Sequence, residues 1–219
     1  MKTIKARTIH LACILLPLII TSCKNTTTEY WPNGTIKSEI QVKKGVYDGH
    51  AIYWYDDGNK ELECYYTNNL LQGSMIRYYP TGRKKEELSY NMGKLDGLSS
   101  SWYPDGIKSS ESTFINGLLN GPFHEYYPSG SIKIDGHYLD GKFTGKWLYF
   151  DSDEKIVGIG NFDRGTGLQK GLYSNGKVRR EIHYKDNLKD GEEIDYDLQG
   201  KITAIKIYRK GNLTENLRK

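Results

Sequence analysis

The sequence has few prolines and cysteines, and its charges nearly cancel. Six prolines in 219 residues exclude a collagen-like chain, and an aromatic content of 12% argues against long disorder. Residues 1–22 hold three basic side chains and no acidic one. Without them the formal net charge of +4 falls to +1, because 28 basic and 27 acidic side chains remain. This balance excludes the extended basic surface of a nucleic-acid-binding protein.

The sequence also lacks an apolar run long enough to cross a bilayer as a helix. Leu11–Ile20 comprises ten uncharged residues, whereas a spanning helix needs about 20. This run follows a basic start, Met1–His10, and precedes two small polar residues. Residues 1–22 are therefore predicted to be a secretory signal peptide, and an uncleaved signal anchor is the alternative.

The end of this segment, Ile20-Thr21-Ser22-Cys23, resembles a bacterial lipobox. The resemblance implies cleavage between Ser22 and Cys23, a diacylglyceryl thioether on Cys23, and acylation of the new amine. Because each buried methylene adds about 0.8 kcal/mol of membrane affinity, two or three acyl chains would anchor the chain stably. We therefore expect a lipid-anchored protein of the bacterial cell envelope, at the outer rather than the inner membrane.

Cysteine usage is consistent with this anchor. Cys13 would leave with the signal peptide and Cys23 would carry lipid, so Cys64 alone would remain and no internal disulfide is expected. Cys64 is interpreted as a small core residue. The polar stretch after Cys23 indicates that residues 23–29 are the lipidated cysteine and a tether, and residues 30–219 form one repeat domain.

A period of 24 residues organises this domain. Turn-type pairs recur at Asn33-Gly34, Asp57-Gly58, Thr81-Gly82, Asp105-Gly106, Ser129-Gly130, Asp153-Glu154, Asn175-Gly176 and Gln199-Gly200. One step is 22 residues, and the deletion is predicted in a loop at Gly165-Thr166-Gly167. Each unit holds two aromatic-rich segments between turns and no helical period, so the prediction is all-β, with seven hairpin units and a truncated eighth.

The loop sequence Pro-x-Gly predicts a three-residue loop, which would pair Tyr30 with Ile36. Simple alternation from that pair defines a polar face. An acidic ladder is expected on it at Glu39, Glu63, Glu87, Glu111, Asp135 and Glu181. Basic residues two places earlier are expected to share this face at Lys37, Lys85, Lys133 and Arg179.

An aromatic stripe is predicted on the same face at Trp31, Tyr55, Tyr79, Tyr103 and Tyr127. These side chains are interpreted first as cross-strand packing partners, each contributing a few tenths to about 1 kcal/mol. The alternative is a partner-binding stripe, because tyrosine offers a large contact area with a polar tip.

The core of the fifth unit, Asp140-Gly-Lys-Phe-Thr-Gly-Lys-Trp147, resembles a MORN repeat. The frame Tyr-Tyr-Pro-x-Gly followed by Gly-x-x-x-Gly is similar to the MORN-variant repeats of the bacterial YwqK-type antitoxin family, from Tyr30 to about Gly211. The resemblance implies an elongated, twisted sheet of stacked hairpins. The sequence departs from the pattern at Asn69 and Asn187, which replace a turn glycine, and at Glu154.

No catalytic or metal site is predicted. Gly136–Phe143 matches a P-loop except at Phe143, which has no hydroxyl for magnesium, and no histidine pair has metal-ligand spacing. The sequence therefore indicates no enzyme and no cofactor. We expect a non-catalytic envelope scaffold that binds a protein or surface polymer. The alternatives are an antitoxin or immunity protein and, less favoured because of the near-zero net charge, direct lipid binding by the repeats. A glycan hydrolase is a distant third.

Overall fold

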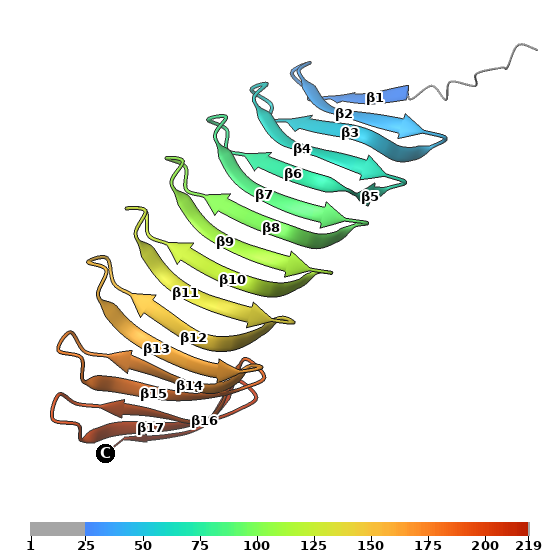
Figure 1. Ribbon diagram of the computed structural model, residues 1–219. Helices are drawn as coiled ribbons and strands as arrows, with labels where there is room; N and C mark the ends of the chain where they lie inside the picture. Colours follow the sequence, from blue (N-terminus) through green and yellow to red (C-terminus); the bar gives the residue numbers. More distant parts are fainter. Residues whose placement is uncertain (1–24, 219) are drawn as a thin grey trace, which may run out of the picture.

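The computed structural model describes residues 25–218, which form strands and turns without a helix (Figure 1). The strands are β1 (Asn25–Tyr30), β2 (Ile36–Lys43), β3 (Val46–Trp54), β4 (Lys60–Thr67), β5 (Leu70–Leu71), β6 (Gly73–Tyr78), β7 (Lys84–Asn91), β8 (Lys94–Trp102), β9 (Lys108–Ile115), β10 (Leu118–Tyr126), β11 (Ile132–Leu139), β12 (Lys142–Phe150), β13 (Ile156–Asp163), β14 (Thr166–Leu172), β15 (Val178–Lys185), β16 (Leu188–Tyr196), β17 (Ile202–Arg209) and β18 (Asn212–Arg218).

All 18 strands belong to one antiparallel sheet. Each strand pairs with its neighbours in the chain, except that β5 and β6 share one place, because both pair with β4. Figure 1 shows the strands stacked in chain order, with no second layer over the part of the chain that is described. The prediction of an all-β, elongated sheet of stacked hairpins is confirmed.

A three-residue loop closes one end of each hairpin. In the first hairpin the backbone N–H of Gly34 donates to Trp31 O at 2.9 Å, and Tyr30 pairs with Ile36 as predicted. Gly34 adopts a φ of 88°, the left-handed conformation that ends this loop. Glu154 takes the same conformation, with a φ of 61°, so its hairpin forms without the glycine.

A β-bulge follows each of these loops. In the first hairpin Glu29 pairs with Ser38 and Tyr30 pairs with Ile36, so Lys37 is opposite no residue of β1. A bulge adds one residue to one strand, so side chains beyond it point to the opposite face from the one that strict alternation would give. The prediction assumed strict alternation. The bulge residues are Lys37, Glu61, Lys85, Ser109, Lys133, Val157, Arg179 and Thr203.

The bulge corrects the predicted faces. Beyond it, register places Ile40, Ala51 and Cys64 side by side on one face, which we call the core face. Glu39 and Glu63 lie on the other, which we call the acidic face, on either side of the intervening β3. The acidic ladder is therefore confirmed as a column, but the prediction that the bulge lysines share its face is wrong.

A two-residue turn closes the other end of each hairpin. In the first, Lys44 and Gly45 have φ values of 51° and 80°, which is the type I′ geometry that matches strand twist. Asn69 and Asn187 replace the usual glycine with φ values of 66° and 65°. Asparagine tolerates this conformation, so both turns are preserved.

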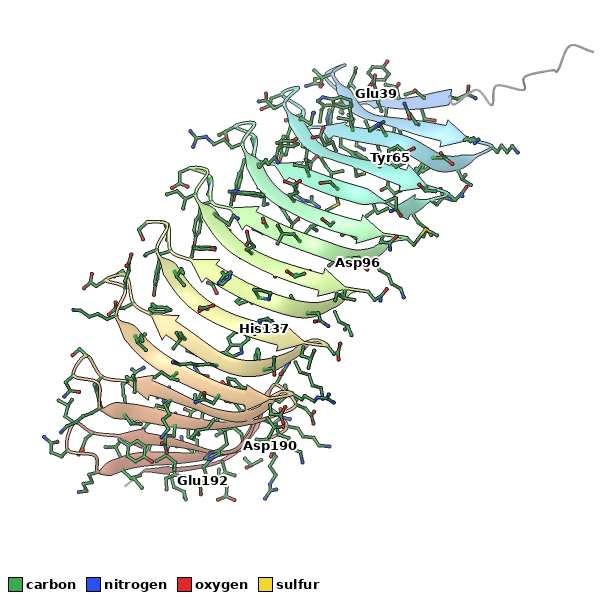
Figure 2. The ribbon with its side chains drawn as sticks, viewed as in Figure 1. Glu39, Tyr65, Asp96, His137, Asp190 and Glu192 are labelled. Atoms are coloured by element: carbon green, nitrogen blue, oxygen red, sulfur yellow. The ribbon has the colours of Figure 1, made fainter. Side chains whose placement is uncertain are left out.

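Adjacent turns are hydrogen-bonded to one another. The N–H of Gly117 donates to a backbone oxygen of the preceding hairpin at 2.7 Å, and the N–H of Asn116 donates to Asp96 Oδ2 at 3.3 Å. Asp190 accepts in the same way from the N–H of Lys210 at 3.1 Å. Figure 2 labels both aspartates beside the turns. The turns thus form a continuous row, which we call the turn edge.

Most second strands of the hairpins contain a wide bulge. In β3 the three residues Asp48, Gly49 and His50 lie opposite Gln41 alone. Strand β14 lacks two of these residues and pairs with β13 without any shift of register. The two-residue deletion therefore lies within a strand, and its prediction in a loop is wrong. Because exactly two side chains are missing, the alternation of faces is preserved.

The predicted tether is also wrong for the residues that the structure describes. Asn25–Tyr30 forms β1, and Asn25 pairs with Val42. The β-branched run Thr26-Thr27-Thr28 favours an extended strand, and an adjacent strand is available to pair with it. Within the described residues the repeat fold therefore already includes Asn25–Tyr30, which were predicted to lie before or at its boundary. Cys23 and the predicted signal peptide lie outside the described residues.

The core face holds two apolar clusters. The first comprises the buried residues Ile40, Ala51, Cys64 and Met75. Cys64 is 5% exposed, which confirms it as a core residue. The second cluster is a set of ring contacts among Phe123, Tyr138, Phe143, Trp147, Phe162 and Tyr184. By register, four serines of β8 and β9 separate the clusters: Ser99, Ser101, Ser110 and Ser112.

Candidate binding surfaces

The aromatic stripe lies along the row of three-residue loops, which we call the loop edge. The hydroxyl of Tyr79 donates to Trp102 O at 2.7 Å, and so joins its hairpin to the next. Equivalent bonds run from Trp31 to Trp54, Tyr55 to Tyr78, Tyr103 to Tyr126, Tyr127 to Phe150 and Tyr173 to Tyr196. The stripe therefore has a packing role, and contact with a partner stays a prediction.

Lysines of the bulges lie over rings of this stripe. The distances from Nζ to the ring centre are 5.3 Å for Lys37 on Trp31, 5.7 Å for Lys85 on Tyr79 and 5.9 Å for Lys133 on Tyr127. Each is within range of a cation–π interaction. The stripe therefore accompanies the bulge lysines, and its predicted place beside the acidic ladder is wrong for the same reason as theirs.

Tyr79 and Lys85 border a hollow of about 480 Å³ on the core face, together with Arg77, Glu86, Ser101, Trp102 and Ser109. Arg77 also lines a second hollow of about 280 Å³, over the first apolar cluster. The Arg77 guanidinium lies 3.8 Å from Glu86. Two aromatic rings, two cations, a carboxylate and hydroxyls thus converge beside the small serine side chains. This arrangement suits a polar, extended ligand.

The sequence analysis missed this hollow because it treated the units as equivalent. The serines of β8 and β9 were the signal in the sequence that these strands differ from the others. Leu88 of β7 pairs with Ser99, whereas the corresponding residues of earlier strands, Ala51 and Met75, are apolar and buried.

Carboxylates of the acidic face are paired with residues that the sequence analysis did not select. Glu63 accepts from Lys60 Nζ at 2.7 Å and from the hydroxyl of Tyr78. Lys84 pairs in the same way with Glu87 at 2.8 Å. Burial and the bond to Glu63 raise the pKa of Tyr78 to about 12. Burial raises the pKa of Glu63, but the bonds from Lys60 and Tyr78 lower it overall. Neither group of this pair therefore exchanges a proton near neutral pH.

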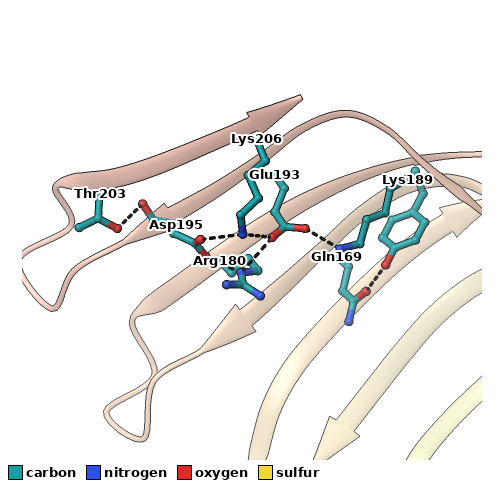
Figure 3. Close-up of polar contacts among 8 residues, drawn as sticks. Gln169, Arg180, Lys189, Glu193, Asp195, Thr203 and Lys206 are labelled. Atoms are coloured by element: carbon teal, nitrogen blue, oxygen red, sulfur yellow. Dashed lines mark hydrogen bonds and ion pairs between the residues drawn. The ribbon is translucent and has the colours of Figure 1, made fainter. Parts of the chain in front are cut away.

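A charged cluster occupies the core face of the last hairpins (Figure 3). Glu193 is 2% exposed and accepts from Lys189 at 2.5 Å and Lys206 at 2.9 Å. Arg180 lies 3.6 Å from Glu193 and bonds to Asp195. Burial raises the pKa of Glu193, but the two lysines outweigh it and the pKa is lowered. The cluster is thus a satisfied ion network, which stabilises a fixed arrangement.

The sequence contained a signal for this cluster as well. The position 17 residues after the glycine of the three-residue loop, such as Gly34, holds Ala51, Met75, Phe123 and Trp147 in other hairpins. Glu193 holds it in the seventh, and a carboxylate at a largely apolar repeat position predicts buried counter-charges.

The residues of the two-residue turns and those of the three-residue loops differ in composition, whereas bulge lysines such as Lys85 add basic side chains beside the loops. Each two-residue turn and the pair of residues that flanks it make up a group of four. Over the first five hairpins these groups together include four basic side chains and one acidic one. Each three-residue loop and its closing pair make up a group of five. Over the same five hairpins these groups together include one basic and three acidic side chains. Large exposed apolar side chains lie at both edges: Leu70, Met92, Ile115, Leu118 and Leu139 belong to the turn group, and Tyr30, Ile36 and Ile132 lie directly beside the loops.

Three further features were compared with the described residues: metal-ligand groups, the P-loop-like stretch and membrane-spanning helices. Residues 25–218 contain no group of three or more histidine, cysteine or acidic side chains placed to hold a metal ion. Gly136–Phe143, the P-loop-like stretch, spans β11, a turn and β12 and precedes no helix. In the same range no helix has the length and apolarity needed to span a membrane.

Comparison with known proteins identifies the repeat. The family profile of the MORN repeat variant matches residues 25–44, 47–68, 71–92, 95–116, 119–140 and 166–186. Among curated proteins no significant match is found. Among solved structures, a chain of the TcdB2–TccC3–Cdc42 crystal structure is 9% identical, with a TM-score of 0.23. That alignment covers 85% of the present chain and 12% of the other.

Proposed function

Since the chain belongs to the MORN repeat variant family, we propose that it is a non-catalytic binding scaffold of the bacterial cell envelope, held to the membrane by acyl chains on Cys23. The observation that carries the scaffold proposal is the single-layer sheet, whose faces are uncovered over residues 25–218. Repeat arrays commonly act by presenting such extended surfaces. The ligand would be a protein or a surface polymer.

The hollow around Arg77 is the part of this surface best suited to a ligand. Its rings offer apolar contact, while Arg77, Glu86 and Ser101 offer hydrogen bonds and charge. Aromatic residues and arginine dominate the binding energy of many interfaces. The aromatic stripe continues from this hollow along the loop edge, so a long ligand would contact both.

Filling the hollow tests the proposal without breaking the tyrosine bonds between hairpins. Ser101→Trp adds a ring inside the hollow, whereas Leu98→Trp adds one to the opposite face of the same strand, where Leu98 is 52% exposed. Species crosslinked to the wild type in cells are identified and then compared between variants. Loss of capture with Ser101→Trp alone supports the site, and equal capture by all three proteins contradicts it.

The membrane anchor is tested separately. Wild-type cells labelled with a fatty acid should yield a processed, labelled chain that fractionates with membranes. Cys23→Ser should abolish the label and leave the precursor unprocessed, because the thiolate accepts the lipid. Cys13→Ser and Cys64→Ser are the controls and should behave as wild type. Labelled Cys23→Ser protein, or wild type in the soluble fraction, would refute the anchor.

A second candidate function is neutralisation of a toxin, as the YwqK-type resemblance implies. The observation that favours it is the exposed pair Asp56-Asp57 in the second loop, which would suit a basic partner. Co-expression with toxin-like products of neighbouring genes tests it. The proposal is supported if the wild type rescues growth and the Asp56→Lys/Asp57→Lys protein does not. A gene neighbourhood without any toxin-like gene would count against it.

A further inference from the structure

The first strand of the sheet has a free side. Among residues 25–218, β1 pairs with β2 on one side and with no strand on the other. Backbone N–H and C=O groups of an antiparallel strand point alternately to its two sides. Directly after β1, the N–H of Trp31 donates to Thr35 O on the β2 side. By alternation, the residues of β1 whose N–H and C=O groups point to the free side are Thr26, Thr28 and Tyr30.

One acceptor at this side lacks the donor that its counterparts receive. The carbonyl oxygen of Trp54, at the same place in the next hairpin, accepts from Trp31 Nε1 at 3.0 Å. Bonds from the aromatic stripe reach the equivalent oxygens of Tyr78, Trp102, Tyr126, Phe150 and Tyr196. No hairpin precedes Tyr30 within residues 25–218, and its side chain is 63% exposed. The free side of β1 can therefore accept a further strand.

The strand at the other end of the sheet is less open to pairing. Strand β18 also has one neighbour among the described strands, β17, but Thr214 within it lies opposite no residue of β17. Such a bulge is one of the devices that protect sheet edges. Strand β1 has no bulge of its own, no proline and no lysine, and Thr26–Thr28 is a β-branched run. By these criteria β1 is the open edge.

Strand direction selects the partner of this edge. Strand β1 leads into a three-residue loop after Tyr30, and β18 leads away from the two-residue turn Lys210-Gly211. Both strands therefore run in the same direction across the sheet. Joining β18 of one copy to β1 of the next would create a parallel pair, whereas every pair in this sheet is antiparallel. A two-fold axis between two β1 strands gives an antiparallel pair and closes the contact after two copies.

We propose that β1 pairs with β1 of a second copy of this chain, in the register that places the two Thr28 residues opposite each other. Each face stays continuous only if the axis passes through a residue, because adjacent residues point to opposite faces. Centring on Thr28 uses all three outward residues, since Thr26 then opposes Tyr30 of the second copy. Centring on Thr27 would pair only Thr26 and Thr28 among them, and centring on Glu29 would set two like charges directly opposite each other.

The pairing would join two sheets into one, with both core faces on the same side. It depends neither on the lipid anchor nor on the hollow around Arg77. The outcome of its test is therefore separate from that of the proposed function.

Single-cysteine variants of the full-length protein test the register. The Cα atoms of the two Thr28 residues would lie about 5.5 Å apart, within the range of about 4.4–6.8 Å that a disulfide spans. With copper–phenanthroline as oxidant, Thr28→Cys should form a disulfide-linked dimer. Thr27→Cys should form at least about fivefold less, because its counterpart would be a diagonal neighbour about 7–8 Å away. Wild type controls for the native cysteines, and Asn216→Cys reports on β18.

Thr28→Pro provides an independent measurement in the protein purified in detergent. Proline removes the N–H that Thr28 directs to the free side, and by alternation this residue makes no backbone bond to β2. Light scattering should give a mass of two copies for wild type and of one copy for Thr28→Pro. Thr28→Val keeps the N–H and the branched side chain and should remain a dimer. Circular dichroism establishes that both variants keep the sheet.

Three results would overturn the inference. Wild type with the mass of one copy would exclude the dimer. Equal disulfide yields from Thr27→Cys and Thr28→Cys would exclude the register. A disulfide-linked dimer formed by Asn216→Cys, with none formed by Thr28→Cys, would assign the contact to β18 instead of β1.

Discussion

The side chain of Asn187 accepts a hydrogen bond from the backbone N–H of Phe143, 44 residues earlier and two hairpins away, at 2.9 Å. Its amide also donates to Gly141 O at 2.8 Å. The contact passes over the sixth turn, at Arg164-Gly165, where Gly165 is buried beneath it. The sixth hairpin is the one whose second strand lacks two residues. The seventh turn therefore binds the fifth across a shortened neighbour.

Asn187→Gly should lower the free energy of unfolding by about 2 kcal/mol, because it removes two hydrogen bonds while glycine keeps the left-handed φ. Asn69→Gly is the matched control. The side chain of Asn69 accepts a bond from the N–H of Tyr47 in the adjacent hairpin at 2.7 Å. Its replacement should cost about 1 kcal/mol. Urea denaturation followed by tryptophan fluorescence measures both, and equal losses would contradict the bridging role.

Gly167→Ala should destabilise the sheet by about 3 kcal/mol. In the straight β13–β14 pair an added Cβ would lie 2.0 Å from Asn161 O, so the backbone has to move. Gly176→Ala meets no atom within 4 Å, but its φ of 82° is unfavourable for alanine, and about 1 kcal/mol is expected. Thermal unfolding compares the two. A larger effect at Gly176 would show that conformation outweighs the close approach of the strands.

Glu193→Gln should cost about 3 kcal/mol at pH 7, because it leaves Lys189 without its buried counter-charge and removes one of the two carboxylates that face Arg180 and Lys206. The exposed neighbour Glu192→Gln should cost less than about 0.5 kcal/mol. The folded pKa of Glu193 is lowered, so its stabilisation is present above the ordinary glutamate value of about 4.3 and is lost as the pH falls through the folded value. The difference between wild type and Glu193→Gln should therefore shrink in acid. A constant difference between pH 7 and pH 2 would contradict this assignment.

Tyr79→Phe removes one hydroxyl of the loop edge and should lower the free energy of unfolding by about 1 kcal/mol, since the carbonyl of Trp102 loses its donor. Tyr30→Phe is the control, because Tyr30 is 63% exposed and lies outside the stripe. Guanidinium denaturation of the two variants is the measurement. If Tyr79→Phe is as stable as Tyr30→Phe, the hydroxyl bonds between hairpins contribute no net stability.

The repeat period was sufficient to predict the hairpins, because it reports on local turn chemistry. The pairing of Tyr30 with Ile36 follows from Pro32 and Gly34 within one loop. The faces were predicted incorrectly because a bulge leaves no distinct residue type: the bulge position holds lysine, glutamate, serine, valine, arginine and threonine in different units. A single unpaired residue such as Lys37 then inverts the assignment of its neighbours.

The candidate surfaces depend on differences between units, which a repeat pattern averages out. Ser101 and Glu193 matter because their counterparts elsewhere are different, and their partners come from neighbouring hairpins. Arg77 reaches its hollow from β6, while Trp102 of the same hollow belongs to β8.

Hydrogen bonds join successive hairpins at both long edges, through tyrosine hydroxyls on one side and backbone amides on the other. Each hairpin is consequently bonded to the next by two rows of hydrogen bonds, one along each long edge. A load applied to one end of the sheet would be transmitted along both rows of bonds at once. It would extend the molecule only by opening hairpins one after another from the end that is pulled.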